Sequence, residues 1–197
     1  MSAHPLKDLI LVGYNNGDIA KIDLTSGNYR EVVYQNPKSS KLYSIAYSHF
    51  GNYIAVGEED GLIMLWQADD LTNPLATLPG HVASIRDLKF SRDGKQLVSA
   101  SMDKTVRVWN MDDMNQQPIV LSDHADWVWS VTFGNQDSQL YAGCKDGVLR
   151  KWPTRVDMMA EYICNNVSRN MTLDEWSTYV AEDIEYETTC PALTSSE

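Results

Sequence analysis

Short runs of alternating apolar and polar residues fill most of the first 153 positions of the chain. Within residues 84–110 the runs SIRDLKF, QLVSAS and TVRVWN are separated by the turn-forming stretches SRDGK and MDK. A period of two places Val106 and Val108 on one face of the last run and Trp109 on the opposite face. The pattern therefore predicts short antiparallel strands joined by tight turns.

These runs recur with a period of 43 residues. Four kinds of residue hold fixed positions in the period: a tryptophan, with an aspartate, an aromatic residue and a histidine before it. The matching residues are Trp66, Trp109 and Trp152; Asp60, Asp103 and Asp146; Tyr47, Phe90 and Phe133; and His81 and His124. An earlier, degenerate copy has Ile22 at the tryptophan position and Asn16 at the aspartate position. The repeat predicts units of about 6–36, 37–79, 80–122 and 123–153, which must stack to bury their faces.

The repeated residues resemble the WD-repeat β-propeller family. The resemblance rests on GH, SRDGK and SASMDKTVRVWN in the third unit, and it extends over about residues 6–153. It implies an all-β fold: a partial β-propeller of three to four four-stranded WD-type blades. A short α-helical C-terminal extension is expected to follow the blades.

The resemblance also implies a structural tetrad in the third unit, in which a buried hydrogen-bond network fixes the turn. Its members are His81, Ser99, Asp103 and Trp109. Partial tetrads follow from the same alignment: His124, Asp146 and Trp152 in the fourth unit, and Asp60 and Trp66 in the second. A Ser-His-Asp set also suits a hydrolase using a His/Asp pair, and this stays an alternative. A buried serine without oxyanion donors or a GxSxG motif favours the structural role, so we predict no enzyme and no catalytic residue.

A protein or peptide is the partner that the resemblance implies. In the family, residues that open the innermost strand of a blade, and the residue before the turn aspartate, commonly face partners. By alignment, the candidate partner-binding face comprises Lys41, Tyr43, Ser84, Arg86, Trp127 and Trp129 at the strand openings, and Glu59, Met102 and Lys145 before the turns. Tyr, Trp, Arg and Met are typical of interface hot spots. For Trp127 and Trp129, packing between blades is the open alternative, and Arg86 and Trp129 are placed to form a cation–π pair.

The pattern changes after Pro153. Apolar residues then recur with a helical period, at Val156, Met159, Ile163 and Val167. The TLDE stretch at 172–175 is a capping box that opens a second helix through Trp176 and Tyr179. We expect residues 154–197 to form an acidic helical extension that caps the last blade, with a separate binding module as the alternative.

This extension resembles the ending of large bacterial WD-repeat proteins, whose repeats often follow a signalling NTPase, protease-like or kinase domain. The residues that carry this second resemblance are Cys164, Arg169, Asn170, Thr172, Glu175, Trp176, Tyr179, Tyr186, Thr189, Cys190 and Pro191. It implies that the chain is the C-terminal part of a larger bacterial protein. For Cys164 and Cys190 a disulfide stays open, but a cytosolic setting favours free thiols.

Composition narrows the function further. A net charge of −11 argues against nucleic acid and against anionic membrane surfaces as partners. The three cysteines show no CxxC or His/Cys ligand spacing, so we expect no metal and no cofactor. Without a signal peptide or a spanning apolar run, the sequence predicts a cytoplasmic protein.

Ring closure is the remaining question, because propellers typically have four to eight blades. The first unit is expected to lack its opening strand, and the fourth to lack its closing strand. Blades of a longer chain, a second copy or a separate chain would complete the ring, in that order of preference. The leading hypothesis is a non-enzymatic protein-interaction or sensing scaffold. Two alternatives from other classes stay open: a purely structural half-propeller that assembles with a second copy or chain, and a hydrolase using a His/Asp pair.

Overall fold

The computed structural model describes residues 1–26, 29–179, 185–188, 190–191 and 193. The chain divides into two compact units, Met1–Lys151 and Trp152–Glu197. Thr189, which belongs to the tail motif, lies outside the described residues.

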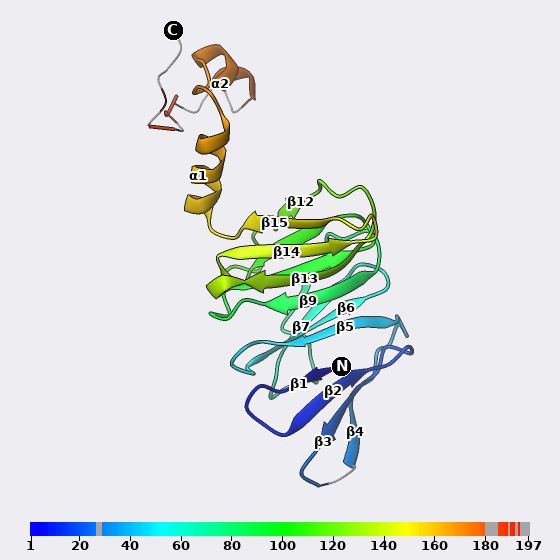
Figure 1. Cartoon of the computed structure of the whole chain (residues 1–197). Coiled ribbons are helices and arrows are strands. Elements are labelled where there is room, and N and C mark those ends of the chain that lie inside the picture. Colours follow the sequence, from blue (N-terminus) through cyan, green and yellow to red (C-terminus); the bar gives the residue numbers. More distant parts are fainter. Residues whose placement is uncertain (27–28, 180–184, 189, 192, 194–197) are drawn as a thin grey trace. The chain divides into compact units, whose positions relative to one another are not determined.

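The first unit consists of successive sheets, each built from neighbouring segments of the chain (Figure 1). The strands of the first two sheets are β1 (Ser2–Ala3), β2 (Leu9–Gly13), β3 (Ile19–Asp23) and β4 (Tyr29–Tyr34), then β5 (Leu42–Tyr47), β6 (Tyr53–Glu58), β7 (Ile63–Gln67) and β8 (Ala76–Leu78). Those of the last two are β9 (Ile85–Phe90), β10 (Gln96–Ser101), β11 (Val106–Asn110) and β12 (Ile119–Leu121), then β13 (Val128–Gly134), β14 (Gln139–Cys144) and β15 (Leu149–Pro153). A 3₁₀ turn, Asn135–Asp137, follows β13. Strands that are adjacent in sequence pair antiparallel, which confirms the predicted all-β, partial-propeller fold class.

The first sheet differs from the prediction in one respect, because it does have an opening strand. Ser2 pairs with Leu11, and Ala3 pairs with Ile10. A strand of two residues is too short to show alternation, so the sequence pattern could not reveal it. The fourth sheet has three strands among the described residues.

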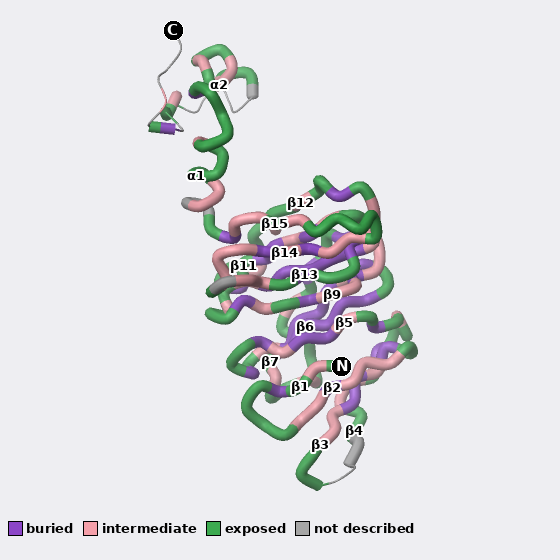
Figure 2. The backbone as a smooth tube through the Cα atoms, viewed as in Figure 1, coloured by how far each residue is buried: buried purple, intermediate pink, exposed green. Residues whose placement is uncertain are grey.

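Two hydrophobic clusters lie between neighbouring sheets, where Figure 2 shows buried backbone along the inner strands. Trp66 of the second sheet packs in one cluster with Leu11 of the first sheet. Leu65, the next residue along the strand, packs in the other cluster with Trp109 of the third sheet. Successive side chains of a strand point to opposite faces, so both faces of the second sheet are buried. Each fully buried large apolar side chain contributes about 1.5–3 kcal/mol, and the units gain this only by stacking.

The second unit contains the two predicted helices, α1 (Val156–Asn166) and α2 (Leu173–Tyr179). The predicted capping box is confirmed: Thr172 donates its backbone N–H to Glu175 Oε2 at 2.9 Å, and Glu175 donates its own to Thr172 Oγ1 at 3.2 Å. Both terminal nitrogens of Arg169 donate to the same carboxylate at 2.7 Å. The Arg169 hydrogen bond is the main reason that the pKa of Glu175 falls to about 2.

A disulfide joins Cys164 of α1 to Cys190, with their Cα atoms 5.3 Å apart. The buried Asn170 supports this link, because its side chain donates to the Cys190 carbonyl at 3.0 Å and accepts from the Cys190 N–H at 2.8 Å. The expectation of free thiols is therefore wrong. That expectation rests on the compartment alone, whereas the chain geometry around Asn170 is not visible in sequence. That the extension caps the last blade stays a prediction. Among the described residues, no helix is long and apolar enough to cross a membrane.

Candidate functional site

A chain of hydrogen-bonded side chains crosses the third sheet and joins the four residues of the expected tetrad. Trp109 on β11 donates its indole N–H to Ser99 Oγ on β10 at 2.9 Å, and His81 Nε2 lies 2.7 Å from the same oxygen. His81 Nδ1 lies 2.7 Å from Asp103 Oδ2. With the proton of a neutral His81 on Nδ1, tryptophan donates to serine, serine to histidine and histidine to aspartate. Each side-chain N–H and O–H of this four-residue network then has an acceptor.

The turn at Asp103 adds further donors to this network. Thr105 donates its hydroxyl and its backbone N–H to Asp103 Oδ1 at 2.7 and 2.9 Å, and Val82 donates its N–H to Oδ2 at 3.2 Å. Burial opposes the ionisation of Asp103, but the hydrogen bonds from His81 and Thr105 outweigh it and hold the pKa of the carboxyl well below its usual value. Burial also lowers the pKa of His81. Sequence reasoning missed Thr105, although an aspartate that bonds the residue two positions later is a known turn signal.

The second sheet keeps the tryptophan but loses the network. Val56 stands where the third sheet has its serine, and both Val56 and Trp66 are fully buried. The Trp66 Nε1 atom has no hydrogen-bond partner among the described residues, and its ring packs edge-on against Tyr34 at 5.1 Å between centroids. Asp60 is exposed and accepts the Leu62 N–H at 3.1 Å. Here the tryptophan is held by packing.

In the fourth sheet the turn aspartate has a different side-chain partner, an arginine. Asp146 Oδ2 lies 3.0 Å from Arg150 Nη1, and Asp146 Oδ1 accepts the Val148 N–H at 2.9 Å. His124 is buried, which lowers its pKa, and its Nδ1 lies 3.9 Å from Asp123 Oδ1. Trp152 falls in the second compact unit. Arg150 is thus a partner of the turn aspartate that the repeat pattern did not indicate.

Side chains from three sheets meet where the innermost strands begin, and we call this set the aromatic–basic strip: Tyr43, Arg86, Trp129, Trp127 and Lys145. The Arg86 guanidinium carbon lies 4.6 Å from the centroid of the Tyr43 ring and 4.8 Å from that of Trp129. Trp129 meets Trp127 edge-to-face at 5.9 Å, and Lys145 Nζ lies 4.1 Å from the Trp127 ring. The Arg86–Trp129 contact has the cation–π geometry that the sequence suggested. Contacts of this kind contribute about 0.5–1 kcal/mol each at exposed sites.

The other four residues of the candidate face border this strip. Lys41 Nζ and the Tyr43 hydroxyl both donate to Glu59 Oε1, at 3.2 and 3.3 Å. Ser84 donates its hydroxyl to the Glu59 carbonyl at 3.1 Å, and the Met102 N–H donates to the Ser84 carbonyl at 3.0 Å. All nine candidate residues therefore belong to one continuous network of side-chain and backbone contacts.

The exposed rings of the strip are also in contact with one another and with cations. Trp129 is 41% exposed and Tyr43 is 39% exposed, whereas their neighbours in sequence on the packing face, Val128 and Leu42, are buried. Trp129 points away from the packing face, as the alternation predicts. Lys145 also pairs with Asp126 at 3.7 Å, a residue that sequence reasoning did not include. An exposed aromatic side chain that its neighbours already hold in place loses little entropy when a partner binds.

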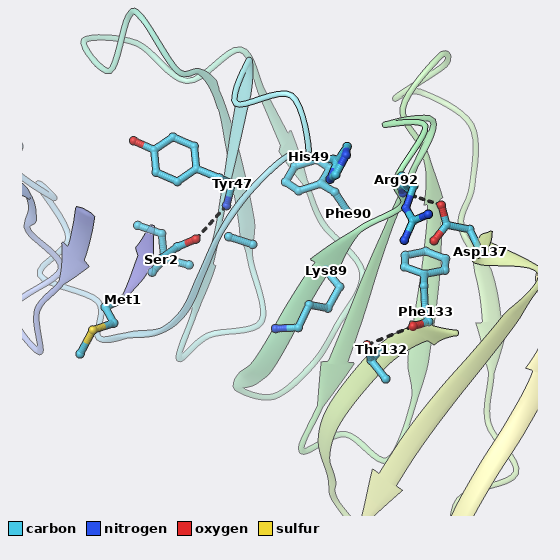
Figure 3. Close-up of a pocket in the computed structure, with 12 residues that line it drawn as sticks. Met1, Ser2, Tyr47, His49, Lys89, Phe90, Arg92, Thr132, Phe133 and Asp137 are labelled. Atoms are coloured by element: carbon cyan, nitrogen blue, oxygen red, sulfur yellow. Dashed lines mark hydrogen bonds between the residues drawn. The ribbon is translucent and has the colours of Figure 1, made fainter. Parts of the chain in front are cut away.

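A cavity of about 370 Å³ lies at the opposite end of the innermost strands (Figure 3). It is lined by the periodic aromatic residues Tyr47, Phe90 and Phe133, together with His49, Lys89, Arg92 and Asp137, among others. The Arg92 N–H donates to Asp137 Oδ2 at 2.5 Å, which joins the third sheet to the turn after β13. Among the described residues, no group of three His, Cys, Asp or Glu side chains is placed to hold a metal ion.

Comparison with known families agrees with the repeat. A family model described as WD domain, G-beta repeat, matches residues 30–67, 72–110 and 115–153. The three ranges cover more than half of the chain, and each ends one residue after a periodic tryptophan. Most of the degenerate first unit lies outside them. No curated protein matched the chain.

Proposed function

Because the chain belongs to the WD-repeat family, we propose that it is a non-enzymatic protein-interaction scaffold that binds a protein or peptide partner on the aromatic–basic strip. The observation that carries the proposal is the ladder of Tyr43, Arg86 and Trp129 at the openings of three innermost strands, in which two exposed aromatic rings contact a partly exposed arginine. Aromatic and arginine side chains dominate binding energy at protein interfaces. The chemistry of the strip therefore fits a polypeptide.

The burial of the tetrad supports a scaffold over a hydrolase. Ser99 is 0% exposed and His81 is 5% exposed. The Ser99 hydroxyl is also fully engaged by Trp109 and His81, so a substrate carbonyl has no approach to it. A nucleophile needs such an approach and a nearby oxyanion site.

Peptide selection tests the proposal, because it requires no partner to be chosen in advance. A random dodecapeptide library displayed on phage is panned against the purified chain, and the affinity of enriched peptides is measured by fluorescence polarisation. We expect Trp127→Ala/Trp129→Ala to weaken their binding at least tenfold, while the chain stays folded and loses only the stability of the few ring contacts removed. The control is Arg92→Gln, at the other end of β9. Enriched peptides that bind the double variant normally would refute the proposal, and lost stability or assembly without lost binding would favour the structural half-propeller.

The larger context is a second part of the proposal. The fourth sheet has three strands among the described residues, so a further strand is needed to match the others. We propose that blades of a longer, bacterial protein complete the ring, ahead of a second copy or a separate chain. Light scattering tests this on the chain as it stands, because a stable, well-behaved monomer would count against all three routes.

Cellular location stays a prediction. The sequence predicts a cytoplasmic setting, and the Cys164–Cys190 disulfide is the observation that weighs against it, because such bonds are rare in reducing compartments. Alkylation of thiols in freshly lysed cells, followed by mass spectrometry, decides between the two. Labelled Cys164 and Cys190 would support the cytoplasm.

A further inference from the structure

Arg86 has an unusual environment for a cation at the centre of the strip. It is only partly exposed, and its guanidinium lies between two aromatic rings, those of Tyr43 and Trp129. Among the described residues it forms no ion pair and its side chain donates no hydrogen bond. Ring faces stabilise the charge but do not use the N–H groups at the edge of the guanidinium. Arg86 therefore keeps up to five donors available.

The lysines beside it are different, because each already faces a carboxylate. Lys41 pairs with Glu59 at 3.2 Å, and this hydrogen bond raises the pKa of Lys41. Lys145 pairs with Asp126 at 3.7 Å. The carboxylates that border the strip, Glu59 and Asp126, are therefore already paired, and Arg86 is the cation of the strip without a counter-charge in the described part of the chain.

The geometry points to Arg86 as the anchor for a carboxylate, the side chain of an Asp or Glu in a partner peptide, and this rests on the proposed function. The two rings beside the guanidinium limit its movement, and a guanidinium held in this way suits a two-pronged contact with a carboxylate. Trp129 and Trp127 lie beside the anchor and offer apolar surface to a neighbouring side chain of the same peptide.

Charge balance favours a carboxylate over a phosphate group. A phosphate carries close to two negative charges and is typically held by a cluster of arginines. Here one arginine lacks a partner, and the flanking Glu59 and Asp126 carboxylates would repel a dianion. A single negative charge matches the single unpaired cation.

A double-mutant cycle between protein and peptide tests the anchor. The probe is the tightest peptide from the phage selection, made in three forms: as selected, with its acidic residue changed to the matching amide, and with phosphoserine at that position. Each form is titrated against wild type, Arg86→Gln and Arg86→Lys, with Arg92→Gln, in the turn just after the same strand, as the charge-matched control. Unfolding midpoints of all variants show that they are folded.

We expect selected peptides to contain Asp or Glu, and the amide form to bind wild type at least tenfold more weakly. On Arg86→Gln the acidic and amide forms should bind within about twofold of each other. Arg86→Lys should recover part of the loss, and Arg92→Gln should behave as wild type. Higher salt should weaken the binding of the acidic form more than that of the amide form.

The opposing outcomes separate this inference from the proposed function. Peptides that bind the strip, fail on Trp127→Ala/Trp129→Ala and yet bind equally well as acid or amide would overturn the carboxylate anchor alone. No enriched peptide, or binding that no strip variant weakens, would overturn the proposed function itself. Phosphoserine binding much tighter than the acid, and only with Arg86 present, would show that the anchor serves phosphate and that the assignment to a carboxylate is wrong.

Discussion

Two aspartates at the same position of the repeat should differ sharply in what they contribute to stability. Asp103 accepts four hydrogen bonds, from His81, Val82 and twice from Thr105, and its side chain is 3% exposed. Asp60 is exposed and accepts one, from the Leu62 N–H. We therefore predict that Asp103→Ala destabilises the chain much more than Asp60→Ala.

The magnitude follows from what each change leaves behind. A hydrogen bond to a charged group contributes about 1.5–3 kcal/mol, and a buried donor left without a partner costs about 1–3 kcal/mol. Water can enter the truncated site and replace part of the loss, so the four bonds of Asp103 do not add. We expect about 3 kcal/mol for Asp103→Ala, with the stranded His81 Nδ1–H as the main reason, and below about 1 kcal/mol for Asp60→Ala.

Urea unfolding of the full chain, followed by near-UV circular dichroism, measures both losses under the same conditions. Asp103→Asn serves as a partial restoration, because the amide oxygen still accepts one bond while its NH₂ group meets donors. Its loss should fall between wild type and alanine. Equal losses for the two alanine variants would show that the network around Asp103 contributes nothing beyond the turn, and would refute the account of the tetrad.

Two further predictions concern pH and redox state. Burial lowers the pKa of His81, so below about pH 6.5 the unfolded chain binds a proton that the folded chain excludes; stability should fall on acidification, with a smaller slope in His81→Gln. The lowered pKa of Asp103 adds to this fall at lower pH. Stability that does not change with pH would contradict both expectations. Reduction of the Cys164–Cys190 disulfide, which spans 26 residues, should cost about 3 kcal/mol of stability and lower the temperature at which the helices melt. The number of free thiols per chain should rise from one, Cys144, to three, and three free thiols before reduction would contradict the bond.

The sheets were predictable because each unit repeats a pattern dictated by packing. Both faces of the second sheet lie against neighbours, so Leu65 and Trp66 are equally constrained although they point in opposite directions. Two features of the structure have no periodic signal in the sequence and were therefore not predicted. The strand Ser2–Ala3 is defined by its pairing with β2, and the Cys164–Cys190 link depends on how Asn170 folds the tail back.

The candidate site was predictable in its positions but not in its contacts. Alignment of the repeats placed Tyr43, Arg86 and Trp129 at the openings of the innermost strands and so predicted all three residues of the ladder. That Arg86 would lack a counter-charge, however, depends on Lys41 taking Glu59 and on Lys145 taking Asp126. From the sequence alone, Glu59 or Asp126 could equally have paired with Arg86, because only the distances in the structure show which cation each carboxylate reaches.

The period also explains why the ladder exists. Tyr43, Arg86 and Trp129 are 43 residues apart, so they occupy the same place in three successive sheets. Stacked repeats bring equivalent positions side by side, which turns one column of the sequence into one row on the surface. Each rung then depends on the next: without Trp129, Arg86 keeps only the Tyr43 ring and loses part of its orientation. Truncating both Trp129 and Arg86 should therefore weaken peptide binding by less than the product of the two separate losses, because contacting residues are not additive.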